Sequence, residues 1–491
     1  MKFEVYKDGK VVEKFKLRGA YLFGTDGIAI RRAQIMFKKG FIECKKPTLE
    51  TAGLALLWSI DGFGQVLLPT TCLPERVRPY NLNLEISRAK LMQIINKRED
   101  WSFFDKIEGL AEISKQSQDL FIQAIQNIST PPQASKLADE SLKKAIVLSE
   151  KLATRQAESL FITRHSSHGF GRGCLGCRIT AAQITNSKYV DALLRLFGFV
   201  VIPINWAQIE SEKGNYDFSK VDACVNLLSK KKLAIGAGPL LCFSKKYLPK
   251  WLLRNPGGFE KIRDTAYQFV SKVLSRYCST IHTWFVVSGL NMFNHFAFSF
   301  EQVLEMTRAA NMAVKAISDR AVKIIEISNL WGEYYARESN TIPPLVYVDM
   351  VVQSGINFDA FGLQMQFGKD QAGMYIRDMM QISSVLDYFG PLAKPLYITS
   401  VEVPSSEGNG SEDQRAAGVS NSQWDQLRQA RWIEQFYKIA LSKPFVDSVM
   451  YSNLADTDSS IIANSGLLTR QFEPKKSYQI LKNLHEAIFS W

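Results

Sequence analysis

The sequence predicts a chain of three parts: an N-terminal β-sandwich, a helical connector and a C-terminal (β/α)8 barrel of the TIM type. Three observations predict this order. Strand signals separated by turns fill residues 1–85, apolar residues recur at helical spacing over 86–160, and short apolar strands alternate with helix-length stretches over 161–491. Alternation of the last kind is typical of a parallel sheet, and this many units favour a closed barrel or a doubly wound sheet.

The first part carries a strong hairpin signal. The apolar runs Phe3–Tyr6 and Val11–Phe15 flank the turn residues Asp8 and Gly9. Further apolar or alternating runs lie at Ala33–Phe37 and Leu54–Ile60. A small β-sandwich ahead of a barrel can bind carbohydrate or can serve only as a packing domain, and both interpretations stay open.

The second part has the spacing of helices. Leu91, Ile94 and Ile95 recur on one helical face, and later apolar residues do the same. Ser129–Pro132 interrupts the pattern and separates two helices. We interpret this segment as a structural connector.

Short apolar strands are spread over the third part. They are predicted at Phe199–Ile204, Leu233–Leu241, Trp284–Val287, Val322–Ile327, Ala360–Met365, Pro395–Val401 and Val446–Tyr451. Phe259–Tyr277 and Phe300–Ile317 are examples of the helices predicted between them. No Gly-rich phosphate loop follows the first of these strands, which disfavours a dinucleotide-binding fold.

The composition allows a large hydrophobic core and bears on whether the chain binds nucleic acid. The chain has 491 residues, of which 46% are hydrophobic and 22% charged, which suits two or three domains. The net charge of +12 could attract nucleic acid or another anionic polymer. Because no Arg and Lys patch is interleaved with aromatics in a nucleic-acid motif, we interpret the charge as solvated surface and expect no nucleic-acid partner.

The N-terminal residues and the cysteines indicate the cellular compartment. The first residues, Met1 to Asp8, are not followed by the apolar core of a signal peptide, and no apolar run is long enough to cross a bilayer. The seven cysteines are odd in number and scattered, which indicates free thiols in a reducing compartment. We therefore expect a cytoplasmic protein without a membrane partner.

Several motifs follow one another in a defined order through the third part. They are Asn205–Glu210 with Gly214–Phe218, Leu248–Leu252, Trp284–Asn291, Phe361–Gln366, Tyr397–Glu402, and Tyr451–Asp456 with Gly466–Leu468. Their order and spacing resemble family 10 of the glycoside hydrolases, the xylanase family of retaining enzymes with a (β/α)8 barrel. The resemblance covers about residues 190–485.

The resemblance implies a sugar-binding site at the C-terminal ends of the barrel strands, with substitutions at the family's catalytic positions. The proton-donating Glu corresponds to Gly289, and the nucleophilic Glu corresponds to Ser400. A Lys that contacts sugar in the family corresponds to Asn205, and the His of strand six corresponds to Gln366.

Two carboxylates remain as candidates for catalysis. Retaining hydrolysis uses two carboxyls about 5–5.5 Å apart. Glu402 faces the same way as Ser400 because strand side chains alternate, so it is a candidate nucleophile, or else an ordinary charged residue at a strand end. Glu333 follows the fifth family strand among aromatic neighbours, so it is a candidate proton donor, or else a Glu that caps a helix.

Other polar and aromatic residues are candidates for binding substrate. The set is Asn205, Trp206, Trp251, Asn291, Gln364, Gln366 and Tyr451. Amides at strand ends can read sugar hydroxyls or can satisfy hydrogen bonds at the core rim. The Trp residues can line subsites or pack the core.

A group of His and Cys residues has the residue types of a zinc site. His165 and His168 precede Cys174 and Cys177 within one short segment. The spacing is more compressed than that of common zinc fingers. We therefore predict no metal and no cofactor.

Two functions are compatible with this sequence. The first is a glycoside-hydrolase-like enzyme that acts on a β-linked, xylan-type polysaccharide or oligosaccharide, with Glu402 as nucleophile and Glu333 as proton donor. The second is a catalytically inactive barrel that binds a glycan or a protein partner through the same mouth. The sequence does not give the oligomeric state.

Overall fold

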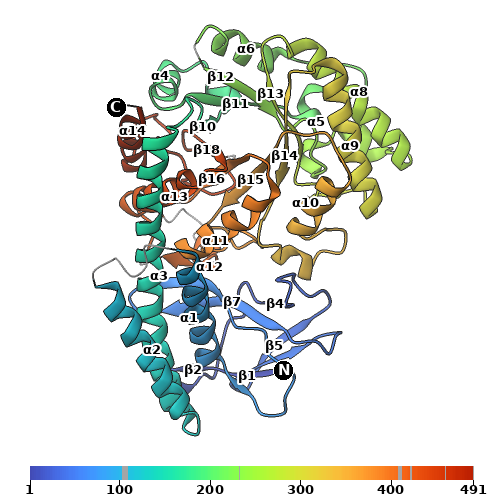
Figure 1. Ribbon diagram of the computed structural model, residues 1–491. Helices are drawn as coiled ribbons and strands as arrows, with labels where there is room; N and C mark the ends of the chain where they lie inside the picture. Colours follow the sequence, from blue (N-terminus) through green and yellow to red (C-terminus); the bar gives the residue numbers. More distant parts are fainter. Residues whose placement is uncertain (102–108, 232, 407–411, 421–422, 459, 490–491) are drawn as a thin grey trace.

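The computed structural model describes the chain except residues 102–108, 232, 407–411, 421–422, 459 and 490–491. A β-rich part and a bundle of helices lie at one end of the molecule, and a barrel lies at the other (Figure 1). The predicted three-part architecture is confirmed.

Two four-stranded sheets form the N-terminal part. The first has the order β5 (Gln34–Lys38), β6 (Phe41–Lys45), β1 (Lys2–Glu4) and β9 (Tyr80–Asn81). The second has the order β17 (Val419–Ser420), β8 (Gly64–Pro69), β7 (Gly53–Ile60) and β4 (Tyr21–Phe23). The predicted hairpin is present as β2 (Tyr6–Lys7) and β3 (Lys10–Val11). Strand β17 comes from the barrel part, so the second sheet is completed by a segment far away in the sequence.

Three helices make up the described residues of the connector. They are α1 (Leu82–Asp100), α2 (Leu110–Gln126) and α3 (Pro131–Ser167). The Asn81 side chain caps α1 by accepting from the Leu84 amide. The first of these helices begins at Leu82 and the last ends at Ser167, so they overlap the segment 86–160 proposed as the connector. Helix α3 runs beside both the β-rich part and the barrel, so it ties the two together (Figure 1).

Eight parallel strands close the barrel. Their order is β10 (Leu175–Arg178), β11 (Phe199–Pro203), β12 (Ala234–Gly238), β13 (Thr283–Ser288), β14 (Val322–Ile327), β15 (Ala360–Gln366), β16 (Leu396–Glu402) and β18 (Val446–Tyr451). Seven of these strands are the predicted ones. The first, β10, was not predicted, because it is short and carries Gly176 between two cysteines.

Helices surround the barrel. They are α4 (Ser187–Leu196), α5 (Trp206–Ile209), α6 (Ser219–Leu228), α7 (Lys250–Arg254), α8 (Phe259–Tyr277), α9 (Phe300–Ile317), α10 (Pro344–Gln353), α11 (Met379–Phe389), α12 (Glu412–Ala416), α13 (Gln426–Ser442) and α14 (Lys476–Phe489). Single turns of 3-10 helix lie at η2 (Ala181–Gln183), η3 (Lys245–Tyr247), η4 (Glu333–Ala336) and η5 (Gly390–Leu392). A capping box of Ser299 and Gln302 fixes the start of α9.

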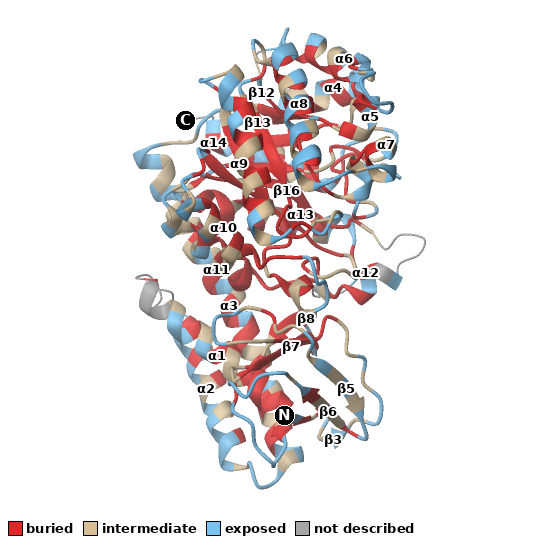
Figure 2. Cartoon of the chain, turned by 90° about the vertical axis from the view of Figure 1, so that its right-hand side faces the viewer, coloured by how far each residue is buried: buried red, intermediate tan, exposed pale blue. Residues whose placement is uncertain are grey.

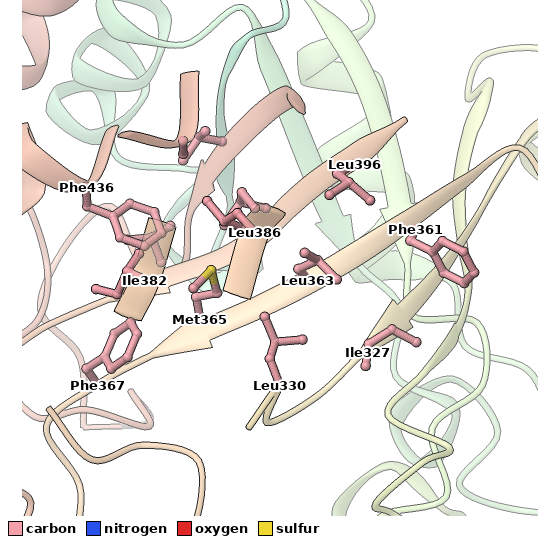
Figure 3. Close-up of a cluster of buried hydrophobic side chains, with 14 of the residues drawn as sticks. Ile327, Leu330, Phe361, Leu363, Met365, Phe367, Ile382, Leu386, Leu396 and Phe436 are labelled. Carbon is pink, nitrogen blue, oxygen red and sulfur yellow. The ribbon is translucent and has the colours of Figure 1, made fainter. Parts of the chain in front are cut away.

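The core has an inner and an outer layer. Inside the barrel lie Phe199, Val201, Phe285, Ile324, Ala360 and Met450. Outside it, apolar side chains of β14, β15 and β16 pack against α11 and α13, as shown for Leu363, Ile382 and Phe436 in Figure 3. Buried residues follow the strands and inner helix faces, and exposed residues cover the outer surface (Figure 2). None of the helices in the described ranges is long and apolar enough to cross a membrane.

Candidate functional site

A pocket of about 770 Å³ opens at the C-terminal ends of the barrel strands. This is the end at which (β/α)8 enzymes carry their chemistry. Polar side chains at the ends of opposite strands reach it. They include Arg178, Asn205, Ser288, Gln364, Gln366, Ser400, Glu402 and Asn453.

An ion pair lies inside the barrel, and its Arg178 lines the pocket. Arg178 ends β10 and Glu326 lies on β14, the strand four places away around the ring of eight. The Arg178 guanidinium pairs with the Glu326 carboxylate, and its Nε donates to the Thr399 carbonyl at 2.7 Å. Gly362 leaves the space for this pair, because a Cβ there would lie 2.9 Å from Cγ of Glu326. The pair therefore crosses the barrel beneath the mouth.

The sequence analysis did not single out Glu326 as a residue inside the barrel. The signal was a single acidic residue in the apolar run Val322–Ile327, two positions after Ile324, whose side chain lies inside the barrel. Strand alternation puts both side chains on the same face. Glu326 is fully buried, and its Oε2 has no hydrogen-bond partner among the described residues.

A chain of amide and hydroxyl groups continues along the wall. Ser328 Oγ donates to Gln364 Oε1 at 2.6 Å, and Gln364 Nε2 donates to Ser288 Oγ at 3.1 Å. Gln364 and Ser288 both line the pocket. This chain holds the Gln364 amide in one orientation, with neutral polar groups facing the space above.

Glu402 reaches the pocket, but its carboxylate already has three donors. Gln366 Nε2, Asn453 Nδ2 and Ser465 Oγ each donate to it at 2.6 Å. Burial raises the pKa of Glu402, and these donors act in the opposite direction. Both oxygens are thereby engaged by the protein itself.

The second predicted carboxylate, Glu333, is not brought to the pocket. It starts η4, is 3% exposed, and forms an ion pair with the buried Arg377. It also accepts a hydrogen bond from the Gly373 amide. Glu333 is absent from the described residues that line the pocket. The predicted pair of Glu402 and Glu333 therefore does not meet in this cavity.

The backbone at Gly289 excludes a side chain. Its φ is +62°, and a Cβ would lie 2.6 Å from both Phe293 Cδ2 and Ser328 Oγ. The Gly289 amide donates to the Glu326 carbonyl at 2.9 Å, which fixes this turn at the end of β13. A larger residue at this position needs a different local backbone.

The two predicted Trp residues pack edge to face outside the described lining of the main pocket. Trp206 is buried, donates to Glu210 Oε2 at 2.7 Å and stacks on Phe269. Trp251 donates to the Glu210 carbonyl at 3.0 Å and borders a separate small pocket of about 140 Å³. Neither ring belongs to the described lining of the main pocket.

Some of the remaining predicted binding residues are buried with protein partners, and others line the pocket. Asn291 is buried and bonds the Ser328 carbonyl at 2.8 Å and the Tyr334 hydroxyl at 2.6 Å. Tyr451 is buried and donates to the Ser465 carbonyl at 2.6 Å. Asn205 lines the pocket, and its buried Oδ1 has no partner among the described residues. Asn205, Gln364 and Gln366 are thus the predicted binding residues that the structure brings together at the pocket.

The His and Cys group is split between two elements. His165 lies near the end of α3, where Nε2 is 3.2 Å from the Ile488 carbonyl, and His168 follows that helix. Cys174 and Cys177 are buried at β10. Within the described part of the chain, no group of three or more His, Cys, Asp or Glu could hold a metal ion.

Comparisons with known proteins agree on the barrel. The family model described as "Glycosyl hydrolase family 10" matches residues 166–484. Native xylanase 10B from Thermotoga maritima is similar in fold, with 17% identity, a TM-score of 0.51, and coverage of 69% of this chain and 99% of that one. Xylanase 10B from Thermotoga petrophila RKU-1, solved with xylobiose, gives 17% identity, a TM-score of 0.50, and coverage of 67% and 96%.

A curated relative matches a shorter segment. "Beta-galactosidase-1-like protein 3" of Rattus norvegicus is 33% identical over 110 residues, which is 20% of this chain. The chain spans only 17% of that relative's length.

Proposed function

Because the chain belongs to glycosyl hydrolase family 10, we propose that its barrel mouth binds a β-linked, xylan-type oligosaccharide without hydrolysing it. The chain is glycoside-hydrolase-like in its barrel and in the position of its pocket. The proposal adds that Gly289 and Ser400 stand where the family carries its two acids, so that binding is retained while the chemistry is lost.

One observation carries the proposal: the pocket holds neutral polar groups where hydrolysis needs a pair of carboxyls. The acidic side chains among its described lining residues are Glu402 and Asp217. Asp217 is exposed, and hydrogen bonds from Ser219 lower its pKa, which makes it a poor proton donor. With Asp217 unsuited as a proton donor, Glu402 alone supplies neither a retaining nor an inverting pair.

The same groups suit sugar hydroxyls. Gln364 is held in a fixed orientation, and Asn205 presents an acceptor without a partner among the described residues. An unpaired acceptor at a pocket favours a ligand that donates to it, since burying such a group unpaired costs about 1–3 kcal/mol. Oligosaccharides carry many hydroxyl donors.

Hydrolysis is the second candidate, and the raised pKa of Glu402 favours it, because a carboxyl that holds its proton can act as an acid. That route needs a second carboxyl, and Glu333 is paired with Arg377 outside the described pocket lining. Screening aryl β-glycosides and xylan with the wild-type protein and with Glu402→Gln separates the two functions. Turnover that disappears in Glu402→Gln would favour the enzyme.

Binding is tested by calorimetric titration with xylotetraose. We expect saturable binding that Gln364→Ala weakens about tenfold, because that change removes a hydrogen-bonding amide from the wall. Gln123→Ala, on the exposed surface of α2, is the matched control and should leave the affinity unchanged. If xylotetraose does not bind at all, the proposed function fails.

We also place the protein in the cytoplasm, without a nucleic-acid or membrane partner. The seven cysteines are all unpaired, which agrees with a reducing compartment.

A further inference from the structure

The pocket has two chemically different parts. Around the ends of β13 to β18, its lining is largely amide, hydroxyl and carboxylate groups. Around the ends of β10 and β11, and along η2 and α6, aliphatic residues line the pocket together with Arg178, Thr180, Thr185, Asn205, Gln208, Asp217, Ser219 and Lys220. All of the isoleucine, valine and alanine residues in the described lining belong to this second part, with the exception of Ile461.

The aliphatic part is a groove with apolar walls. Ile179 and Ile184 come from the segment after β10, and Ile209 and Val221 come from α5 and α6; all four are buried. Helix α6 packs beside η2, so these walls face a common space. The outer edge of this part is polar: Thr180 is half-buried, and Thr185, Gln208, Asp217, Ser219 and Lys220 are exposed.

This groove is poorly suited to a further sugar ring. Sugar rings bind through hydroxyl partners at their edges and through aromatic rings at their faces. The aromatic residues of the described lining, Tyr247 and Phe293, follow β12 and β13 and lie outside the groove. Aliphatic walls favour a group without hydroxyls, since burying an unpaired hydroxyl is unfavourable.

We propose that the site takes a β-glycoside with an apolar aglycone, the sugar in the polar mouth and the aglycone in the aliphatic groove. This inference rests on the proposed sugar-binding function and names its ligand class. The two parts are continuous in one cavity of about 770 Å³, within the range of pockets that hold small ligands. Arg178 and Asn205, next to the groove, mark the boundary between sugar and aglycone.

The alkyl chain gives a quantitative test. Each methylene buried in the groove should tighten binding by up to about fourfold. Across methyl, propyl and hexyl β-D-xyloside, measured by ligand-observed NMR, the dissociation constant should fall with each step and by at least about tenfold in total. A constant that does not change with chain length overturns the inference.

Two variants locate the effect. Ala182→Asp and Ala223→Asp place charge on exposed positions of the groove, where folding is not at risk. Both variants should reduce the ratio of the dissociation constants of methyl and hexyl β-D-xyloside about tenfold. They should leave the affinity for xylotetraose unchanged. Ala316→Asp, exposed on α9 outside the described pocket lining, is the control and should change neither. Equal loss for methyl and hexyl xyloside in the groove variants would contradict the assignment.

The outcomes separate this inference from the function on which it rests. Binding of xylotetraose without any dependence on the alkyl chain would overturn the inference alone. Loss of all glycoside binding would overturn the sugar-binding function. Binding of hexanol as tight as that of hexyl xyloside would show that the sugar contributes nothing and would overturn the inference.

Discussion

At the scale of single residues, the backbone at Gly289 opposes any side chain directly after β13. Its left-handed φ of +62° and the close approach of Phe293 and Ser328 both oppose a side chain. Gly355 is a matched control, with a φ of +64° and nothing within 4 Å of its Cβ position. Each change to Ala should cost about 1 kcal/mol for the backbone alone.

Gly289→Ala should therefore lower the free energy of unfolding by about 1–3 kcal/mol more than Gly355→Ala, because it also overpacks the turn. Urea unfolding of the two variants measures the difference. Equal losses would mean that the turn has room for a Cβ and that steric exclusion does not operate at Gly289.

The three donors around Glu402 make a second prediction at this scale. In Glu402→Gln, the new amide NH₂ must face at least one N–H donor from Gln366 or Asn453. The expected loss of stability is about 1–3 kcal/mol, measured by urea unfolding at neutral pH. Glu260→Gln, exposed on α8, should change stability by less than about 0.5 kcal/mol. If Glu402→Gln leaves the free energy of unfolding unchanged, these hydrogen bonds do not contribute to stability.

At the scale of elements, the N-terminal sheet holds the rim loop that follows β15. The Leu67 amide of β8 donates to the Ile376 carbonyl at 3.0 Å, and Gln381 Nε2 donates to the Leu67 carbonyl at 3.1 Å. The same loop carries Met374, which lines the pocket, and Arg377, which pairs with Glu333. Glu333, the predicted proton donor, thus has a structural contact: its ion pair with Arg377 joins two rim loops beside the N-terminal sheet.

Arg377→Met should cost about 3–5 kcal/mol, because it leaves the Glu333 carboxylate buried without a cation. In the ligand-free protein, Arg377→Met should also speed hydrogen exchange of the backbone amides in residues 368–376. Lys323→Met is the control: its ion pair with Asp359, a half-exposed carboxylate, lies at the opposite end of the barrel. If both variants leave exchange in the rim loop unchanged, the ion pair does not hold it.

The success of sequence prediction differs from element to element for physical reasons. Helices α8 and α9 occur over the predicted residues because their amphipathic patterns have clear ends, such as the Ser299 cap. Strand β10 was missed because four residues give little periodicity. Strand β17 was missed because its partner β8 is distant in sequence. For the same reason the partner of Glu333 could not be foreseen, whereas Asn205, Gln364 and Gln366 were found because strand ends meet at one rim.

At the scale of the whole molecule, a half-buried acidic group couples stability to pH at the junction of connector and barrel. Glu150 of α3 accepts the Met379 amide of α11 at 2.6 Å. Burial, followed by the nearby Asp378 carboxylate, raises the pKa of Glu150 from 4.5 to about 7. A raised folded-state pKa gives stability that is present below 4.5 and is lost as pH rises through 7.

Glu150→Gln keeps the acceptor for Met379 and removes the titration. Between pH 5 and pH 8, the wild type should lose about 1–3 kcal/mol relative to this variant, measured by urea unfolding at both pH values. Glu140→Gln, exposed on the same helix, should follow the wild type. A wild type and a Glu150→Gln variant with the same pH dependence would rule out this coupling.

The central claim is that the mouth of this family 10 barrel binds a glycan and leaves it intact. One-dimensional proton NMR of xylotetraose with excess wild-type protein tests both halves at once, since binding broadens the sugar signals and cleavage creates new reducing-end anomeric signals. We expect broadening that free xylotetraose in buffer does not show, with no new anomeric signals after long incubation. New anomeric signals that grow with protein concentration, and that Glu402→Gln abolishes, would contradict it.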